Sequence, residues 1–121
     1  MREPSGKMEL VKEIKDVKIL KVSGDFTLET TPEFQKLCKK VSSKKKTAGI
    51  ILDFNEAEKI DTAAFACMIN FMKENMRGEV KIGIINLKKR EKDLINILKI
   101  GRVIRIFDTE PEAVKALGEI N

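Results

Sequence analysis

An acid and a hydroxyl stand next to each other at Asp61-Thr62, directly before a run of apolar and small residues. Either side chain can cap a helix that starts here, because its oxygen accepts hydrogen bonds from the first free backbone N–H groups. A hydroxyl at a helix N-terminus is also open to modification, since a phosphate placed there meets the positive end of the helix dipole. The sequence therefore leaves two roles open for Thr62, a plain cap and a phosphoacceptor.

The residues behind this pair are small or follow a helical spacing. Ala63, Ala64 and Ala66 put only methyl groups near the hydroxyl, so another protein can approach it. Phe65 and Met68 recur at the spacing of one buried helix face, together with Ile69 and Met72. We expect a helix whose first turn is accessible and whose remaining turns are buried.

A second carboxylate, Asp53, ends an apolar run and could itself accept a phosphoryl group, as in receiver domains. A receiver also needs an acidic pair for Mg²⁺ after its first strand and a lysine after its last strand. Ile14-Lys15-Asp16 and Phe107-Asp108-Thr109 supply these groups poorly. We therefore favour a loop-capping carboxylate at Asp53 over a phosphoacceptor.

The side chains needed for most enzyme chemistry are missing from the sequence. The 121 residues contain no histidine, and Cys38 and Cys67 lack a metal-binding spacing. The glycines form neither a phosphate-binding loop nor a dinucleotide-binding motif. We expect no enzymatic activity, no metal and no cofactor.

The charge balance fits a well-solvated surface. The chain has 24 basic and 19 acidic residues and a net charge of +5. Lys44-Lys45-Lys46 is the densest basic run, but without Trp or Tyr beside it we do not expect nucleic-acid binding. Both cysteines fall on apolar helix faces, and no segment resembles a signal peptide or a membrane span. These features predict a reduced, cytoplasmic protein with no membrane contact.

The elements that position Asp61-Thr62 follow from hydrophobic patterning. Ile50 to Phe54 is apolar without alternation, which predicts a central strand covered on both faces, followed by a short polar connection. Met8 to Ile14 and Val17 to Val22 are separated by two residues, which forces an antiparallel hairpin, and Gly24 is expected to end its second strand. Val80 to Ile85 and Val103 to Phe107 read as further strands.

Helices are expected between these strands. Thr31-Pro32 predicts a helix start, with Phe34, Leu37, Cys38 and Val41 as its buried stripe. Lys88 to Asp93 opens a helix whose basic first turn opposes the dipole; we favour a solvated face there over a contact with an acidic partner. Its apolar residues include Ile95 and Ile97, and Thr109 to Glu112 forms a capping box for the last helix.

These elements predict one α/β domain. Its core spans about residues 8–118, and about five strands form a mixed sheet with about four helices. The N-terminal hairpin is antiparallel and the helix-linked strands are parallel.

Three segments resemble the STAS domain family, which includes anti-sigma factor antagonists and the cytoplasmic domains of sulfate transporters. They are Leu52-Asp53-Phe54, Ile60-Asp61-Thr62-Ala63-Ala64-Phe65-Ala66, and the stretch from Val103 to Ala113. The order of elements agrees as well, over roughly Met8 to Leu117. The likeness is greatest to stand-alone antagonists.

The resemblance implies a function in partner switching. In regulated antagonists a kinase phosphorylates the serine or threonine after the motif's aspartate, which is Thr62 here. It implies an anti-sigma factor with serine/threonine kinase activity and a phosphatase as partners, and a monomer or weak dimer. A STAS module that binds a small ligand is the alternative. The residues expected to form the partner surface are Asp25, Phe26, Thr27, Asp53, Asp61, Ala63, Ala64 and Phe65.

Overall fold

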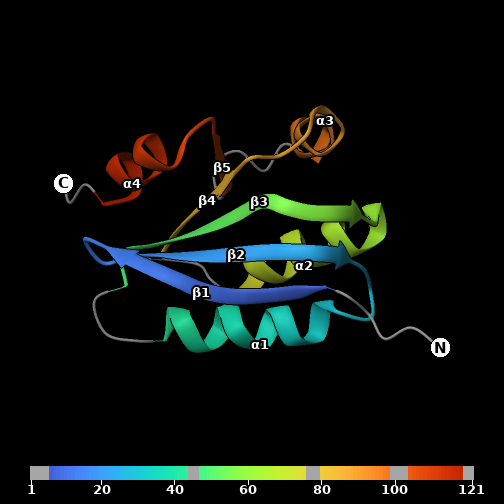
Figure 1. Cartoon of the computed structure of the whole chain (residues 1–121), viewed down its shortest axis with the longest axis horizontal. Coiled ribbons are helices and arrows are strands. Elements are labelled where there is room, and N and C mark those ends of the chain that lie inside the picture. The colour runs from blue at the N-terminus through green and yellow to red at the C-terminus, as the bar shows by residue number, and fades with distance from the viewer. Residues whose placement is uncertain (1–5, 44–46, 76–79, 99–103, 119–121) are drawn as a thin grey trace.

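A computed structural model describes residues 6–43, 47–75, 80–98 and 104–118, which form a five-stranded sheet and four helices (Figure 1). The strand order is β1-β2-β3-β4-β5, so β3 is central as predicted. β1 pairs antiparallel with β2 and all other pairs are parallel, which confirms the predicted fold class. Lys44–Lys46 and Val103 lie outside the described residues. The bounds are β1 Lys7–Ile14, β2 Val17–Phe26, α1 Thr31–Ser42, β3 Gly49–Ile60, α2 Thr62–Asn75, β4 Lys81–Ile85, α3 Lys89–Leu98, β5 Ile104–Phe107 and α4 Glu110–Gly118.

The predicted hairpin forms, but its second strand is longer than expected. Lys15 and Asp16 both have positive φ, 49° and 65°, the conformation of a tight turn whose twist matches a hairpin. β2 then continues through Gly24 to Phe26. Gly24 has a φ of 68° and lies beside a register shift between β2 and β3, so this glycine makes an irregularity in the strand instead of ending it.

β3 is also longer than predicted. Its pairing with β4 stops at Asp53, opposite Ile85, but its pairing with β2 runs on until Ile60 lies opposite Phe26. The expected polar connection after Phe54 is therefore an extension of the strand, mostly exposed apart from buried Ala57. This extension carries the chain to the point where α2 begins.

Two apolar clusters cover the two faces of the sheet. α1 and α2 lie on one face with the larger cluster, and α4 covers the other (Figure 1). Lys18 explains the imperfect alternation predicted for β2: it is 5% exposed, on the α1 side of the sheet. Its Nζ bonds to Glu13 Oε1 at 2.8 Å and Thr47 Oγ1 at 2.9 Å, so the buried charge is paired.

Three details of the helices differ from the predictions. α1 begins at Thr31 with Thr30 in the cap position, and no side chain caps it. Cys38 is buried as expected, but Cys67 is exposed because it faces away from the sheet. In α3, Ile95 packs in the core whereas Ile97 is 73% exposed, because two residues along a helix point to different sides.

Candidate functional site

Asp61 is the residue that joins the sheet to α2. Its backbone N–H donates to the Phe26 carbonyl at 2.9 Å, which ties the end of β3 to the end of β2. Its side-chain Oδ1 accepts the Ala64 N–H at 2.9 Å, and its carbonyl accepts the Phe65 N–H at 2.9 Å. Of the two capping candidates left open by the sequence, Asp61 is therefore the N-cap of α2.

Because Asp61 caps the helix, the Thr62 hydroxyl is not needed for that role. Thr62 is exposed and is the first residue of α2, at the carboxyl ends of β2 and β3. Its Oγ accepts a hydrogen bond of 3.0 Å from an Arg90 terminal nitrogen, Nη2. Thr62 directly follows Asp61, whose backbone N–H is bonded to the Phe26 carbonyl, so it begins α2 beside the end of β2, and the residue is exposed.

Arg90, in the first turn of α3, was not among the predicted site residues. Its Nη2 also donates to the Ile60 carbonyl at 3.0 Å, and its Nε lies 3.5 Å from Glu91 Oε2. Arg90 is exposed, as a solvated first turn implies, but on that surface it also contacts Ile60, Thr62 and Glu91. Lys89 beside it pairs with Asp93. The unfavourable position of a cation at a helix start was the available sequence signal.

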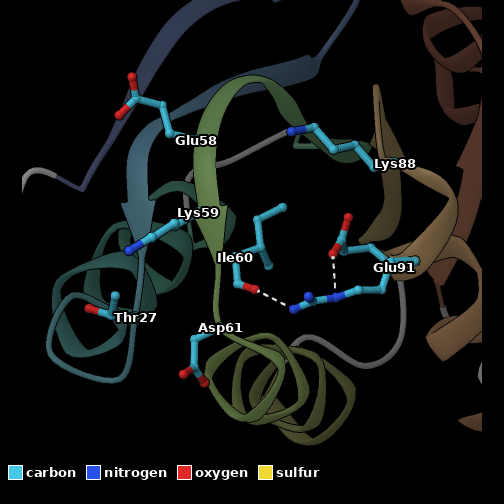
Figure 2. Close-up of a pocket in the computed structure, with 8 residues that line it drawn as sticks. Thr27, Glu58, Lys59, Ile60, Asp61, Lys88 and Glu91 are labelled. Carbon is cyan, nitrogen blue, oxygen red and sulfur yellow. Dashed lines mark hydrogen bonds and ion pairs between the residues drawn. The ribbon is translucent and has the colours of Figure 1, made fainter.

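A hollow of about 460 Å³ lies between the end of β3 and the start of α3 (Figure 2). Thr27 and Asp61 lie on one side of Ile60, and Lys88 and Glu91 lie on the other. Glu91 is 6% exposed, and its Oε1 has no hydrogen-bond partner among the described residues. A buried carboxylate oxygen without a donor is energetically costly, and Glu91 is a lining residue of this hollow that carries one.

Four buried phenylalanines pack against one another in the core next to the site. The Phe26 ring centroid lies 5.0 Å from that of Phe34, 5.6 Å from Phe54 and 6.4 Å from Phe65, and Phe54 and Phe65 are 5.9 Å apart. This cluster joins β2, α1, β3 and α2, so the four elements that meet at the site share one rigid support.

The burial of three predicted contact residues corrects their expected role. Phe26 and Ala64 are 0% exposed and Phe65 is 1% exposed, so their side chains cannot touch a partner. They belong to the support beneath the surface, because the core side of α2 begins at Ala64. The predicted residues that stay accessible or half-buried at this edge are Asp25, Thr27, Asp61, Thr62 and Ala63, which we call the Thr62 surface.

Asp53 has its own set of contacts. Its Oδ1 accepts the Asn55 backbone N–H at 2.9 Å and the Asn86 side-chain N–H at 2.8 Å. Asn86 follows β4 and has a φ of 62°, so the carboxylate fixes the point where β3 and β4 part. These bonds agree with the interpretation of a capping carboxylate, and they do not include any member of the Thr62 surface.

The fold is an α/β domain that carries Asp61-Thr62 at the carboxyl ends of β2 and β3, and comparison with known proteins identifies its family. The family model of the STAS domain matches residues 10–113. The chain therefore belongs to the STAS domain family. Among curated proteins, none matches the sequence.

Solved structures of anti-sigma factor antagonists share this fold. One from Mycobacterium paratuberculosis has a TM-score of 0.78 and 14% identity, covering 98% of each chain. SpoIIAA in its unphosphorylated form has a TM-score of 0.69 and 14% identity, covering 96% of this chain and all (100%) of the other. The Bacillus cell fate determinant SpoIIAA in its phosphorylated form has a TM-score of 0.68 and 13% identity, covering 91% and 98%.

No group of three or more Cys, Asp or Glu side chains in the described part of the chain is arranged to hold a metal ion. None of the helices within the described ranges has the length and apolar character that crossing a bilayer requires.

Proposed function

We propose that this STAS domain is an anti-sigma factor antagonist. Its unmodified Thr62 surface binds an anti-sigma factor that has serine/threonine kinase activity, and that binding frees a sigma factor for transcription in the cytoplasm. The observation that carries the proposal is the accessible Thr62 hydroxyl, released from capping by Asp61. The shared fold of anti-sigma factor antagonists supports it.

The Thr62 surface is suited to reversible protein binding. It combines two acids, Asp25 and Asp61, with the small side chains of Thr27 and Ala63, so a partner can approach the hydroxyl closely. The phenylalanine cluster beneath holds this surface in one arrangement, which lowers the conformational entropy lost on binding. The chain itself acts as a substrate and binding partner and not as an enzyme.

Phosphorylation of Thr62 is the proposed release step. The Thr62 Oγ forms a bond to the γ-phosphorus of ATP, the bond from that phosphorus to the bridging oxygen breaks, ADP leaves, and the hydroxyl proton passes to a base of the kinase. The modification adds about −1.5 to −2 charges beside Asp61. Repulsion and desolvation then weaken the complex, and a phosphatase restores the hydroxyl.

The test is a phosphorylation assay with the anti-sigma factor kinases of the source organism. With ATP and Mg²⁺, mass spectrometry should find one phosphate on Thr62 and none in Thr62→Val. Thr109→Val is the matched control, because Thr109 is an exposed hydroxyl at the start of α4 that accepts the Glu112 N–H. This control should be phosphorylated like the wild type; no phosphate at Thr62 with any of the kinases rejects the proposal.

A small-ligand module is the second candidate, and one observation favours it. Glu91 lines the hollow of about 460 Å³, and its Oε1 is buried without a hydrogen-bond partner among the described residues. A ligand with an N–H or O–H donor would satisfy this oxygen once the side chain turns toward the hollow. Native mass spectrometry of protein purified from its source should then detect a bound molecule that Glu91→Leu loses. A wild-type spectrum without a bound molecule would reject the small-ligand module and leave the anti-sigma factor antagonist as the proposed function.

A further inference from the structure

We propose that Arg90 is a built-in receptor for the phosphoryl group on Thr62, so that the modified side chain is held within the same chain. This inference rests on the proposed phosphorylation of Thr62. It adds a positioning residue, on α3, that lies outside the motif around Asp61-Thr62 and changes how the modification acts.

The Arg90 guanidinium is already aimed at the Thr62 oxygen. Its Nη2 lies 3.0 Å from Thr62 Oγ and 3.0 Å from the Ile60 carbonyl, and its Nε faces Glu91 Oε2 at 3.5 Å. These contacts fix the plane of the group before any phosphate arrives. The Arg90 side chain is 69% exposed, so a phosphoryl group on Thr62 can reach it, and the existing contacts reduce the rotamer freedom that it loses on binding.

The guanidinium also has donors to spare. An arginine carries five N–H groups, and the contacts above use only Nη2 and Nε. Its other terminal nitrogen, Nη1, has no hydrogen-bond partner among the described residues. The two terminal nitrogens match the spacing of two phosphate oxygens, so a bidentate pair can form once a phosphoryl group extends from Oγ.

Several acidic side chains lie near Thr62, so a phosphoryl group there needs a cation that contacts it directly. A second hollow of about 370 Å³ beside Thr62 is lined by Arg90 together with the acids Glu91 and Asp93. Asp61 adds a third carboxylate next to Thr62, and the cations Lys59 and Lys88 line the neighbouring hollow. Arg90 is the cation with a direct hydrogen bond to the Thr62 oxygen, so it faces the new charge most closely.

The contact gives the phosphoryl group a defined place. The positive end of the α2 dipole favours an anion on Thr62, and the Arg90 guanidinium, already bonded to Thr62 Oγ, can donate to the same group. The phosphoryl group then covers the Thr62 surface as a fixed obstacle, and it occupies the arginine. Partner release follows from blocked access and added negative charge together, without a change of fold.

The experiment installs phosphothreonine at position 62 during translation, so that no kinase is needed. The second ionisation of the phosphate, with a pKa of about 6 in an exposed side chain, is followed by ³¹P NMR. We expect a titration midpoint about half a pH unit or more lower in the wild type than in Arg90→Gln, because a nearby cation favours the dianion. Arg90→Lys should fall between them, since a lysine keeps the charge but not the fork.

Lys89→Gln is the matched control. It removes one positive charge from the same turn of α3, but Lys89 pairs with Asp93 and is 90% exposed. Its midpoint should lie much closer to that of the wild type than the midpoint of Arg90→Gln does, because Lys89 makes no hydrogen bond with Thr62 within the described residues and acts on it only through the exposed Asp93. The Arg90 Nε–H signal in the ¹⁵N spectrum of the wild type should titrate with the same midpoint as the phosphate. Coincident midpoints for the wild type and Arg90→Gln overturn the inference. The kinase assay is independent of this titration. If no kinase phosphorylates Thr62, the proposed function is rejected, but the titration can still be interpreted because its phosphothreonine is installed during translation.

Discussion

Asp61 and Thr62 divide two tasks that the sequence alone could not separate. Both residue types cap helices, and a reader of the sequence cannot tell which oxygen meets the first N–H groups. In the structure Asp61 Oδ1 makes that bond at 2.9 Å, and the Thr62 oxygen turns to Arg90. The cap bond of α2 therefore belongs to Asp61, and modification of Thr62 does not require that bond to break.

Asp61→Ala tests this division of tasks through stability. Removing the cap oxygen leaves the Ala64 N–H without its partner, so the free energy of unfolding should fall by about 1 kcal/mol in urea denaturation. Asp108→Ala is the control, because Asp108 is 82% exposed and only lies 3.8 Å from Lys92; its effect should stay within about 0.5 kcal/mol. Equal losses for the two variants would show that Asp61 does not cap α2.

The two cysteines should differ in reactivity. Burial raises the pKa of the Cys38 thiol to about 12, so almost none of it is thiolate at pH 8, whereas Cys67 is exposed. Alkylation of native protein should modify Cys67 first and Cys38 on the order of 100-fold more slowly or slower. Peptide mass spectrometry reads both sites, and urea should abolish the difference. Comparable native rates would contradict the burial of Cys38.

The residues that sequence reasoning missed are those whose contacts cross between elements. The motif around Asp61-Thr62 was found because it is local, but Arg90 is 28 positions away from Thr62 in the chain. Its only local signal was a cation at a helix start. Likewise, hydrophobic spacing identified Phe65 as apolar, but only the packing of Phe26 and Phe54 against it shows that its side chain supports the site and cannot reach a partner.

At the scale of elements, the length of β3 decides where the site stands. Patterning located the apolar half of this strand and failed on the polar half, because Asn55 to Lys59 resemble a loop in composition. Pairing with β2 keeps that half extended, up to Ile60 opposite Phe26. Cross-strand hydrogen bonds of this kind are not encoded in the local pattern, so the extension could not have been predicted from the sequence.

The packing of α4 against the sheet is a second feature of the elements, and it depends on Gly49. A Cβ built on Gly49 would lie 2.9 Å from Leu117 Cβ and 3.3 Å from the Lys81 carbonyl oxygen. Neither atom can move away by a side-chain rotation. The glycine therefore lets α4 approach β3 closely.

Gly49→Ala should lower the free energy of unfolding by about 1–3 kcal/mol, because the added methyl group overpacks this contact. Gly118→Ala is the control, because Gly118 lies on α4, next to Leu117. A Cβ built on Gly118 would lie 3.6 Å from its nearest neighbour, a side-chain carbon of Val17, which is an ordinary contact. Thermal unfolding of the two variants makes the comparison. A Gly49→Ala protein as stable as the wild type would show that α4 does not pack this closely.

At the scale of the whole molecule, the two faces of the sheet form the core, and the carboxyl ends of the strands carry the site. α1 and α2 bury the larger cluster, α4 closes the opposite face, and the carboxyl ends of β2 and β3 hold the Thr62 surface (Figure 1). The fold class and family were predictable because the order of elements and the motif are properties of the whole sequence. Thr62 lies on a surface supported by the packed core, so phosphorylation can change the charge of this surface without changing the fold. This is how we account for the proposed release of the partner.

The most direct test of the account is the affinity of the anti-sigma factor for the protein with and without phosphate on Thr62. Isothermal titration calorimetry should find tight binding of the unmodified protein and binding weaker by about 100-fold or more after phosphorylation. Thr62→Val should bind as the unmodified protein does and stay bound in the presence of ATP. Equal affinities for the modified and unmodified proteins would contradict the account.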